Sequence, residues 1–431
     1  VMIAGEEYST AAEELDLSGR NLTDADLVNL GKMTNLRVLR LEENSALSDL
    51  TPLSGLTGLK SLTLPALSEI QDLTPLAGLT QLEDLGFDSS DHSDAGTRIT
   101  DFSPLAGMTE LRVLRLVCTD LTDLSFLRGM TKLEYLRIHA TLWVQDLTDL
   151  SGLTNLRELQ LDTSGLESAA GIETLTKLER LRIYDEADTF YAEDLSVVAN
   201  MTGLKSLRFD ACGLVSFHGI ENLTELQEAN FYGKEGLYTD LDPFRNLTKL
   251  ETLHLPMRAG GNTEPYRADG LANLSALTEL YMDRSVASLE PLRNLTRLRL
   301  LDVRNGYTMD GTFDSLEPLA GLTGLQELYL MLDKPENPVD LSPLAGLTGL
   351  TSLYLSASRN GDISFANLEA LANLTQLRSL ELQVDNLTDV SALAELPSLQ
   401  TVQLEVYNGG QEGLLDVSVL DHVPNVKLEQ R

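Results

Sequence analysis

The chain is poor in the residues that build catalytic centres, metal sites and disulfide networks. Its 431 residues include two cysteines, five histidines and one tryptophan, and aromatic residues make up only 5%. No histidine pairs with a cysteine or with a second histidine at the spacing of a metal site. Glycine-rich phosphate loops and the GxSxG and HExxH motifs are missing as well. We therefore predict no catalytic residue, no metal site, no cofactor and no enzymatic activity.

Positive charge and long apolar runs are also scarce. The chain has 32 Lys and Arg against 66 Asp and Glu, a formal net charge of −34. This charge repels polyanions and excludes nucleic acid as a partner. No stretch approaches the roughly 20 apolar residues that span a bilayer, so we expect no direct membrane insertion. The opening VMIAGEEYST lacks the features of a signal peptide, and we expect any leader or anchor to lie outside these residues.

What the chain has in abundance is leucine at a fixed period. Residues 111–132 read LRVLRLVCTDLTDLSFLRGMTK and fit a 22-residue template, LxxLxLxxNxLxDLxPLxxLTx, with Thr119 at the Asn position and Phe126 at the Pro position. The first leucine of each LxxLxL unit serves as a marker. The markers are Leu36, Leu59, Leu82, Leu111, Leu133, Leu156, Leu178, Leu204, Leu226, Leu250, Leu277, Leu298, Leu325, Leu350, Leu377 and Leu399, with Ala12 one step earlier.

These markers predict 17 strand segments across residues 12–422. They follow an N-terminal segment at 1–11, and 423–431 is a terminal half-repeat. In LRVLRL the alternating leucines face inward and Arg115 faces outward, which indicates a short strand. The next segment is too short for a stable α-helix, so we expect a 3₁₀ or irregular return. Proline suits such a return and occurs there at Pro52, Pro75, Pro104, Pro243, Pro291, Pro318 and Pro343.

The predicted fold is an α/β solenoid of leucine-rich repeats. Its parallel β-sheet lies on the concave face of a curved superhelix, and short 3₁₀ or irregular returns form the convex face. Repeats such as LTPLSGLTGLKSLTL and LSPLAGLTGLTSLYL resemble the internalin-type class of bacterial leucine-rich repeats. The resemblance implies a right-handed horseshoe that binds proteins on its concave side. The family's turn asparagine is present at Asn44 and replaced at Ser164, Cys212 and Asp385.

Six repeats are longer than the rest, and the extra residues always follow the strand. They fall at 88–98, 184–194, 256–268, 304–314, 332–339 and 356–366. Insertions on one rim of a rigid scaffold are typical of a binding edge, although neutral drift at a tolerant site explains them too. The first insertion carries Asp88, Asp91 and Asp94, but it lacks the oxygen spacing of a calcium loop. We expect a solvated acidic loop there.

The outward strand positions contain a row of basic residues. Arg115, Arg137, Arg182 and Arg208 occupy equivalent places in nearby repeats. Neighbouring like charges destabilise a sheet, so the row requires anions beside it. One interpretation is a polar face neutralised from within by acids such as Asp162. The other is a binding site for an acidic protein partner, in which three further side chains make contacts: Tyr135, His139 and Tyr184.

A second outward row is aromatic and consists of Tyr281, Tyr329 and Tyr354. Tyrosines on adjacent strands stabilise a sheet by themselves, and they also form contacts to a sugar or a protein. The sequence leaves both interpretations open.

We therefore predict a non-catalytic, monomeric protein-binding module that acts at a bacterial cell surface or after secretion. It uses its concave face and one loop rim. The alternatives are a carbohydrate-binding surface protein and an intracellular scaffold similar to the short-repeat phosphatase regulators, which would be cytoplasmic.

Overall fold

The computed structural model describes all residues except 66–68, 88–98, 100, 186, 233–236, 257–264, 284–285, 306–314, 333–337, 358–363, 386, 408–414 and 431. The described residues form two compact units. Unit 1 comprises Val1–Ala192 and Val197–Ala211, and unit 2 comprises Glu193–Ser196 and Cys212–Arg431. Both are stacks of repeats.

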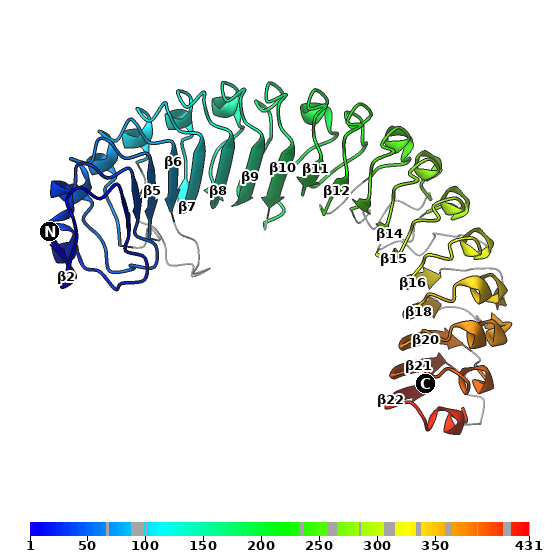
Figure 1. The fold of residues 1–431 in the computed structure, drawn as a ribbon. Helices are drawn as coiled ribbons and strands as arrows, with labels where there is room; N and C mark the ends of the chain where they lie inside the picture. The colour runs from blue at the N-terminus through cyan, green and yellow to red at the C-terminus, as the bar shows by residue number, and fades with distance from the viewer. Residues whose placement is uncertain are drawn as a thin grey trace. The chain divides into compact units, whose positions relative to one another are not determined.

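Unit 1 contains a parallel sheet to which each repeat contributes one strand. Strands pair in chain order, and the register joins equivalent leucines such as Leu114, Leu136 and Leu159. The strands along the inner side of the unit's curve are β3 (Glu14–Asp16), β4 (Val38–Arg40), β5 (Ser61–Leu64), β6 (Asp84–Phe87), β7 (Val113–Leu121), β8 (Tyr135–Leu142), β9 (Glu158–Ser164), β10 (Arg180–Asp185) and β11 (Ser206–Phe209) (Figure 1). An antiparallel hairpin of β1 (Met2–Ile3) and β2 (Glu6–Glu7) precedes them.

Unit 2 repeats the arrangement. Its described strands on the inner side are β12 (Glu228–Asn230), β13 (Thr252–His254), β14 (Glu279–Asp283), β15 (Leu300–Asn305), β16 (Glu327–Leu332), β18 (Ser352–Ala357), β20 (Ser379–Asp385), β21 (Thr401–Tyr407) and β22 (Asn425–Gln430) (Figure 1). A separate parallel pair joins β17 (Val339–Asp340) and β19 (Phe365–Ala366). The parallel inner sheet was predicted from the leucine alternation and is confirmed.

The outer side of each unit consists of short turns, as predicted. One is the four-residue helix α1 (Asp24–Leu27). The others described are 3₁₀ turns at Leu30–Lys32, Thr51–Leu53, Thr74–Leu76, Ser103–Leu105, Ser125–Leu127, Thr148–Leu150, Ser196–Val198, Asp242–Phe244, Asp269–Leu271, Glu290–Leu292, Glu317–Leu319, Ser342–Gly346, Leu368–Asn373, Ser391–Leu393 and Ser418–Leu420. The seven predicted prolines all lie in the first positions of such turns, where no backbone donor is needed.

The repeat leucines form the interior, and one asparagine joins two repeats within it. Asn44 is fully buried, and its Nδ2 lies 2.9 Å from the Leu17 carbonyl oxygen and 3.0 Å from that of Leu41. Its Oδ1 accepts a hydrogen bond of 2.9 Å from the Leu22 amide. Leu17 and Leu22 belong to the preceding repeat, so the side chain supplies the backbone partners that the turn itself lacks.

An aromatic cluster replaces leucine in the first repeats of unit 2. β12 carries the small Ala229 at an inward position. Close to this strand, the ring of Phe217 lies 5.2 Å from that of Phe231 and 4.9 Å from that of Phe244, with all three residues buried. Large rings occupy the volume that smaller side chains would leave empty, which keeps the core at its usual density.

Candidate functional site

The outward side chains of unit 1 form a grid on its concave face. The register of β7 to β11 places one row of equivalent positions side by side: Arg115, Arg137, Gln160, Arg182 and Arg208. A second row, nearer the strand ends, contains Val117, His139, Asp162 and Tyr184. The structure therefore brings together the four arginines that the sequence singled out, with the neutral Gln160 interrupting their row.

Each of these arginines has an acidic partner. Arg115 Nη2 lies 2.7 Å from Asp84 Oδ1, and Arg208 Nη2 lies 2.9 Å from Asp210 Oδ2. Arg137 and Arg182 share one acid, Asp162. Asp84 is an acid that the sequence did not suggest; it lies on the neighbouring strand β6, two residues before Gly86, which is the register partner of Arg115.

Asp162 bridges two arginines. Its Oδ1 accepts a 2.6 Å hydrogen bond from Arg182 Nε, and its Oδ2 lies 3.4 Å from Arg137 Nη2. The Asp162 side chain is only 9% exposed, whereas those of Arg182 and Arg137 are 39% and 36% exposed. The carboxylate therefore lies beneath the guanidinium groups. The face is paired internally, and yet it presents positive charge to solvent.

Aromatic side chains flank the arginines. The Arg208 guanidinium carbon lies 4.6 Å from the centre of the Tyr184 ring, and that of Arg182 lies 5.3 Å away, within the range of cation–π attraction. Tyr135, two residues before Arg137 on β8, is half-buried, and burial raises the pKa of its hydroxyl, with the Glu158 charge adding to the effect. His139 is exposed. These contacts hold Tyr184 in a fixed position, which reduces the entropy cost of binding.

The single tryptophan is a part of this face that sequence analysis missed. Trp143 is 61% exposed. It follows the end of β8, two residues beyond Thr141, and continues the alternation by which Tyr135, Arg137 and His139 point outward. Counting the alternation one step past the predicted strand would have identified it.

In unit 2 the predicted tyrosine row is not one continuous stack. Tyr281 and Tyr329 are separated by Asp302, which occupies the equivalent position on β15. Tyr329 and Tyr354 are direct neighbours on β16 and β18. Burial raises the pKa of all three hydroxyls. The strand β15 thus divides the row into two parts, Tyr281 on one side and the pair of Tyr329 and Tyr354 on the other.

Arg304, which the sequence did not suggest, lies over the pair of Tyr329 and Tyr354. Arg304 forms two hydrogen bonds to Asp302, of 2.7 and 2.9 Å. Its guanidinium carbon lies 4.2 Å from the Tyr329 ring centre and 5.2 Å from that of Tyr354. Hydrogen bonding to Asp302 raises the pKa of Arg304 above its already high ordinary value. Because it already lies over these rings, they are poor platforms for a sugar.

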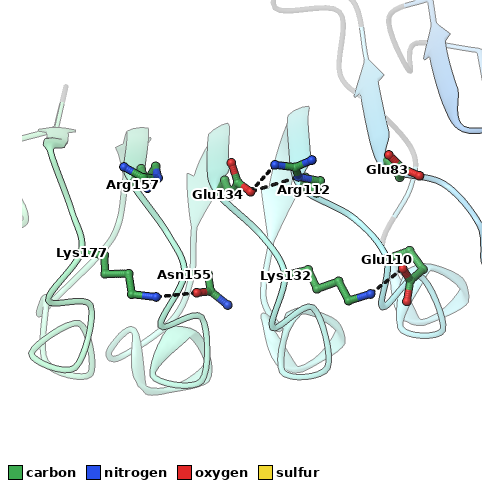
Figure 2. A pocket seen from close by; sticks show the side chains of 8 residues that line it. All are labelled: Glu83, Glu110, Arg112, Lys132, Glu134, Asn155, Arg157 and Lys177. Carbon is green, nitrogen blue, oxygen red and sulfur yellow. Dashed lines mark hydrogen bonds and ion pairs between the residues drawn. The ribbon is translucent and has the colours of Figure 1, made fainter.

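The edge of unit 1 where the strands begin carries a ladder of charges around a hollow of about 500 Å³. Its lining residues are Glu83, Glu110, Arg112, Lys132, Glu134, Asn155, Arg157 and Lys177 (Figure 2). Arg112 pairs with Glu134 at 2.6 Å, and Lys132 pairs with Glu110 at 2.6 Å, each across one repeat. Exposed pairs of this kind contribute about 0–1 kcal/mol each. We interpret the ladder as a link between neighbouring repeats, distinct from the concave face.

The predicted absence of a metal site and the predicted loop rim both involve insertions that lie mostly outside the described residues. Among the residues that the structure describes, no cluster of three or more His, Cys, Asp or Glu could hold a metal ion. Asp88, Asp91 and Asp94 lie outside the described residues, as do most residues of the other insertions apart from 184–194. In that insertion, the buried Asp185 accepts a 2.6 Å hydrogen bond from the Phe190 amide.

The described part of the chain contains no helix with the length and apolar character that a membrane crossing requires. No family model matches the chain, and no curated protein matches it in sequence.

The fold of the chain is similar to that of several solved leucine-rich-repeat structures. A leucine-rich-repeat protein of Leptospira interrogans aligns with a TM-score of 0.62 and 17% identity, covering 98% of this chain and 96% of that one. The functional domain of InlJ from Listeria monocytogenes aligns with a TM-score of 0.64 and 19% identity, over 88% and 75% of the two chains. Drosophila Toll, in its complex with Spatzle, aligns with a TM-score of 0.60 and 18% identity, over 92% and 54%. The chain is a leucine-rich-repeat solenoid with the fold of internalin-type proteins.

Proposed function

We propose that the concave face of unit 1 binds a protein partner through an acidic segment of that partner. The observation that carries this proposal is the layering at Asp162, whose buried carboxylate lies below the more exposed guanidinium groups of Arg137 and Arg182. An acidic side chain that docks there meets several cations within a protein of net charge −34. Such local complementarity accelerates association and excludes most other partners.

The neighbouring aromatic residues supply the apolar part of the site. Tyr184 is held by two arginines, and the exposed Trp143 extends the same face beyond β8. Tyrosine, tryptophan and arginine are the residue types that contribute most to protein interfaces when they become buried. We therefore expect Trp143 to act as an anchor beside the charged row, and Tyr135 and His139 to make further contacts.

The proposed setting is a bacterial cell surface or the medium outside the cell, with the protein acting as a monomer without catalytic activity. Its similarity to internalin InlJ supports this setting at the level of the fold. Toll, which shares the fold, was solved with a protein bound. A solenoid of this kind offers an extended rigid surface on which many outward side chains reach one partner.

The test is selection from a random 16-residue phage-displayed peptide library on the immobilised protein. We expect the enriched peptides to be rich in Asp and Glu and to contain an apolar residue. Their affinity should fall at least tenfold on a variant that combines Arg137→Gln, Arg182→Gln and Arg208→Gln. Glutamine keeps a donor for the buried carboxylates below, so the variant should still fold. Binding should also weaken as salt increases.

A control variant removes the same number of charges at the edge where the strands begin. It combines Arg112→Gln, Lys132→Gln and Arg157→Gln, all at the hollow in Figure 2. We expect this variant to bind the selected peptides within about twofold of the parent. Both variants remove three positive charges, so their long-range effect on an acidic peptide is the same and is weakened by salt, and only the concave variant also removes direct contacts. Peptides without acidic enrichment, or equal losses in the two variants, would show that the concave arginines do not form the site.

A further inference from the structure

Three aromatic rings form a cluster on the concave face of unit 2, apart from the arginine row of unit 1. The rings of His254 and Tyr281, on neighbouring strands, are stacked with their centres 3.7 Å apart and an angle of 14° between them. The Tyr232 ring lies 5.3 Å from His254, and its Oη is 3.2 Å from His254 Nδ1. Tyr232 is 45% exposed. The cluster therefore combines an ordered ring stack with one ring open to solvent.

Beside the rings lies a buried polar group whose hydrogen bonding is incomplete. Asn230 is only 8% exposed, and the register places it directly next to His254. Its Nδ2 donates a 2.6 Å hydrogen bond to Glu228 Oε1, which assigns the two ends of the amide. The remaining atom, Oδ1, is buried and has no hydrogen-bond partner among the described residues. Native proteins rarely leave a buried acceptor unpaired, so such an atom points to a missing donor.

We propose that this cluster, formed by Asn230, Tyr232, His254 and Tyr281, binds a hexopyranose unit of a glycan. The exposed Tyr232 ring receives the apolar C–H face of the sugar, and a sugar hydroxyl donates its hydrogen to Asn230 Oδ1. Sites for small ligands combine aromatic surface with a few fixed polar groups in this way. A tyrosine gives a large contact area for a small loss of side-chain entropy.

Two features favour a sugar hydroxyl over a cationic side chain of a protein. The acceptor is a neutral amide oxygen, and the Glu228 carboxylate beside it already accepts a hydrogen bond from the same amide. The flat His254 and Tyr281 stack is also distinct from the pair formed by Tyr329 and Tyr354, over which Arg304 lies. Of the outward tyrosines in the predicted row, Tyr281 is therefore the one that belongs to the glycan site.

Binding requires a local movement, because the Asn230 oxygen is buried before the ligand arrives. Tyr232 is two residues further along the chain, on the same side of the backbone. A rotation of its 45% exposed ring about the Cα–Cβ bond would exchange the 3.2 Å contact with His254 Nδ1 for contacts with the ligand. The site is thus expected to open by a side-chain rotation, while the strand register of β12 and β13 stays unchanged.

The test is saturation-transfer NMR of the whole protein with methyl pyranosides of glucose, galactose, mannose and N-acetylglucosamine. We expect at least one to bind, with a dissociation constant on the order of millimolar and saturation concentrated on the C–H protons of one sugar face. Tyr232→Ala and Asn230→Ala should each weaken binding about tenfold or more. Tyr232→Phe keeps the aromatic ring and should retain the stacking contribution.

The matched control is Tyr329→Ala, which removes a tyrosine from an equivalent position two strands beyond Tyr281 and should leave sugar binding unchanged. The melting temperature of every variant shows that it is folded. Failure of all four pyranosides to bind would overturn the proposal, as would equal binding by Asn230→Ala and the parent. Competition of the sugar by arginine methyl ester would instead indicate a cation site. Peptide binding at unit 1 is measured separately, so the two proposals fail independently.

Discussion

The ion pair of Asp162 and Arg182 combines a buried acid with a more exposed base, and the loss of unfolding free energy should differ according to which of the two is removed. In Arg182→Ala, Asp162 loses its 2.6 Å hydrogen bond and keeps only the 3.4 Å contact to Arg137. A hydrogen bond to a charged group contributes about 1.5–3 kcal/mol. Because Arg182 is 39% exposed, solvent screens part of this, and we expect a loss of about 1 kcal/mol in the free energy of unfolding.

Replacing the acid in place of the arginine should lower the free energy of unfolding by less. In Asp162→Asn the arginines remain able to reach water, so we expect a loss of about 0.5 kcal/mol or less. The double variant should be more stable than the sum of the two single changes implies, with a coupling energy of about 0.5–1 kcal/mol. Arg180→Ala, at a 68% exposed arginine that pairs with Glu158, provides a matched control and should change stability by less than about 0.5 kcal/mol.

Urea unfolding followed by the fluorescence of Trp143 measures these changes. The chain has one tryptophan, and it follows β8, which pairs directly with β9 where Asp162 lies. The signal therefore reports on the repeats that carry the ion pair, a useful property in a solenoid whose repeats contact mainly their neighbours. If Asp162→Asn destabilises the protein more than Arg182→Ala, or if the double variant shows no coupling, the layering of carboxylate below guanidinium is wrong.

Three further predictions concern the scaffold. Asn44→Ala should lower the free energy of unfolding by about 2–4 kcal/mol, measured by urea titration, because several buried backbone groups lose their partner; a loss below 0.5 kcal/mol would contradict this. Phe217→Ala should cost about 3–5 kcal/mol in the same assay, whereas Phe217→Leu should cost much less, and equal losses would refute the packing argument. Hydrogen bonds from the serine two residues onward lower the pKa of Asp101, Asp123 and Asp389. Their stabilisation is therefore complete above the unfolded pKa of about 4 and is lost as the pH falls through the lower folded values. Changing all three to asparagine should reduce the fall in melting temperature between pH 7 and pH 3, measured by circular dichroism, and an unchanged fall would show that these groups do not contribute.

The repeat pattern was sufficient to predict the scaffold. A leucine at every second position of a short segment specifies an inward face, and the 22-residue period brings equivalent segments side by side. The short segment after each strand predicted a 3₁₀ or irregular return, and the seven prolines within these segments suited such a return. The same alternation identified which side chains point outward, and so it located the arginine and tyrosine rows correctly on the concave face of their units.

Within those rows, the tertiary structure decided which side chains touch. Hydrogen-bond and ion-pair partners depend on distances of a few tenths of an ångström, on side-chain rotamers and on burial, none of which a periodic pattern encodes. Asp84 pairs with Arg115 across an enlarged repeat, and Arg304 turns toward Tyr329, which belongs to the next strand. The unpaired oxygen of Asn230 likewise has no signature in the sequence. Leucine periodicity determined the fold because every repeat must bury the same apolar stripe, whereas the chemistry of the concave face depends on contacts between repeats that only their packing produces.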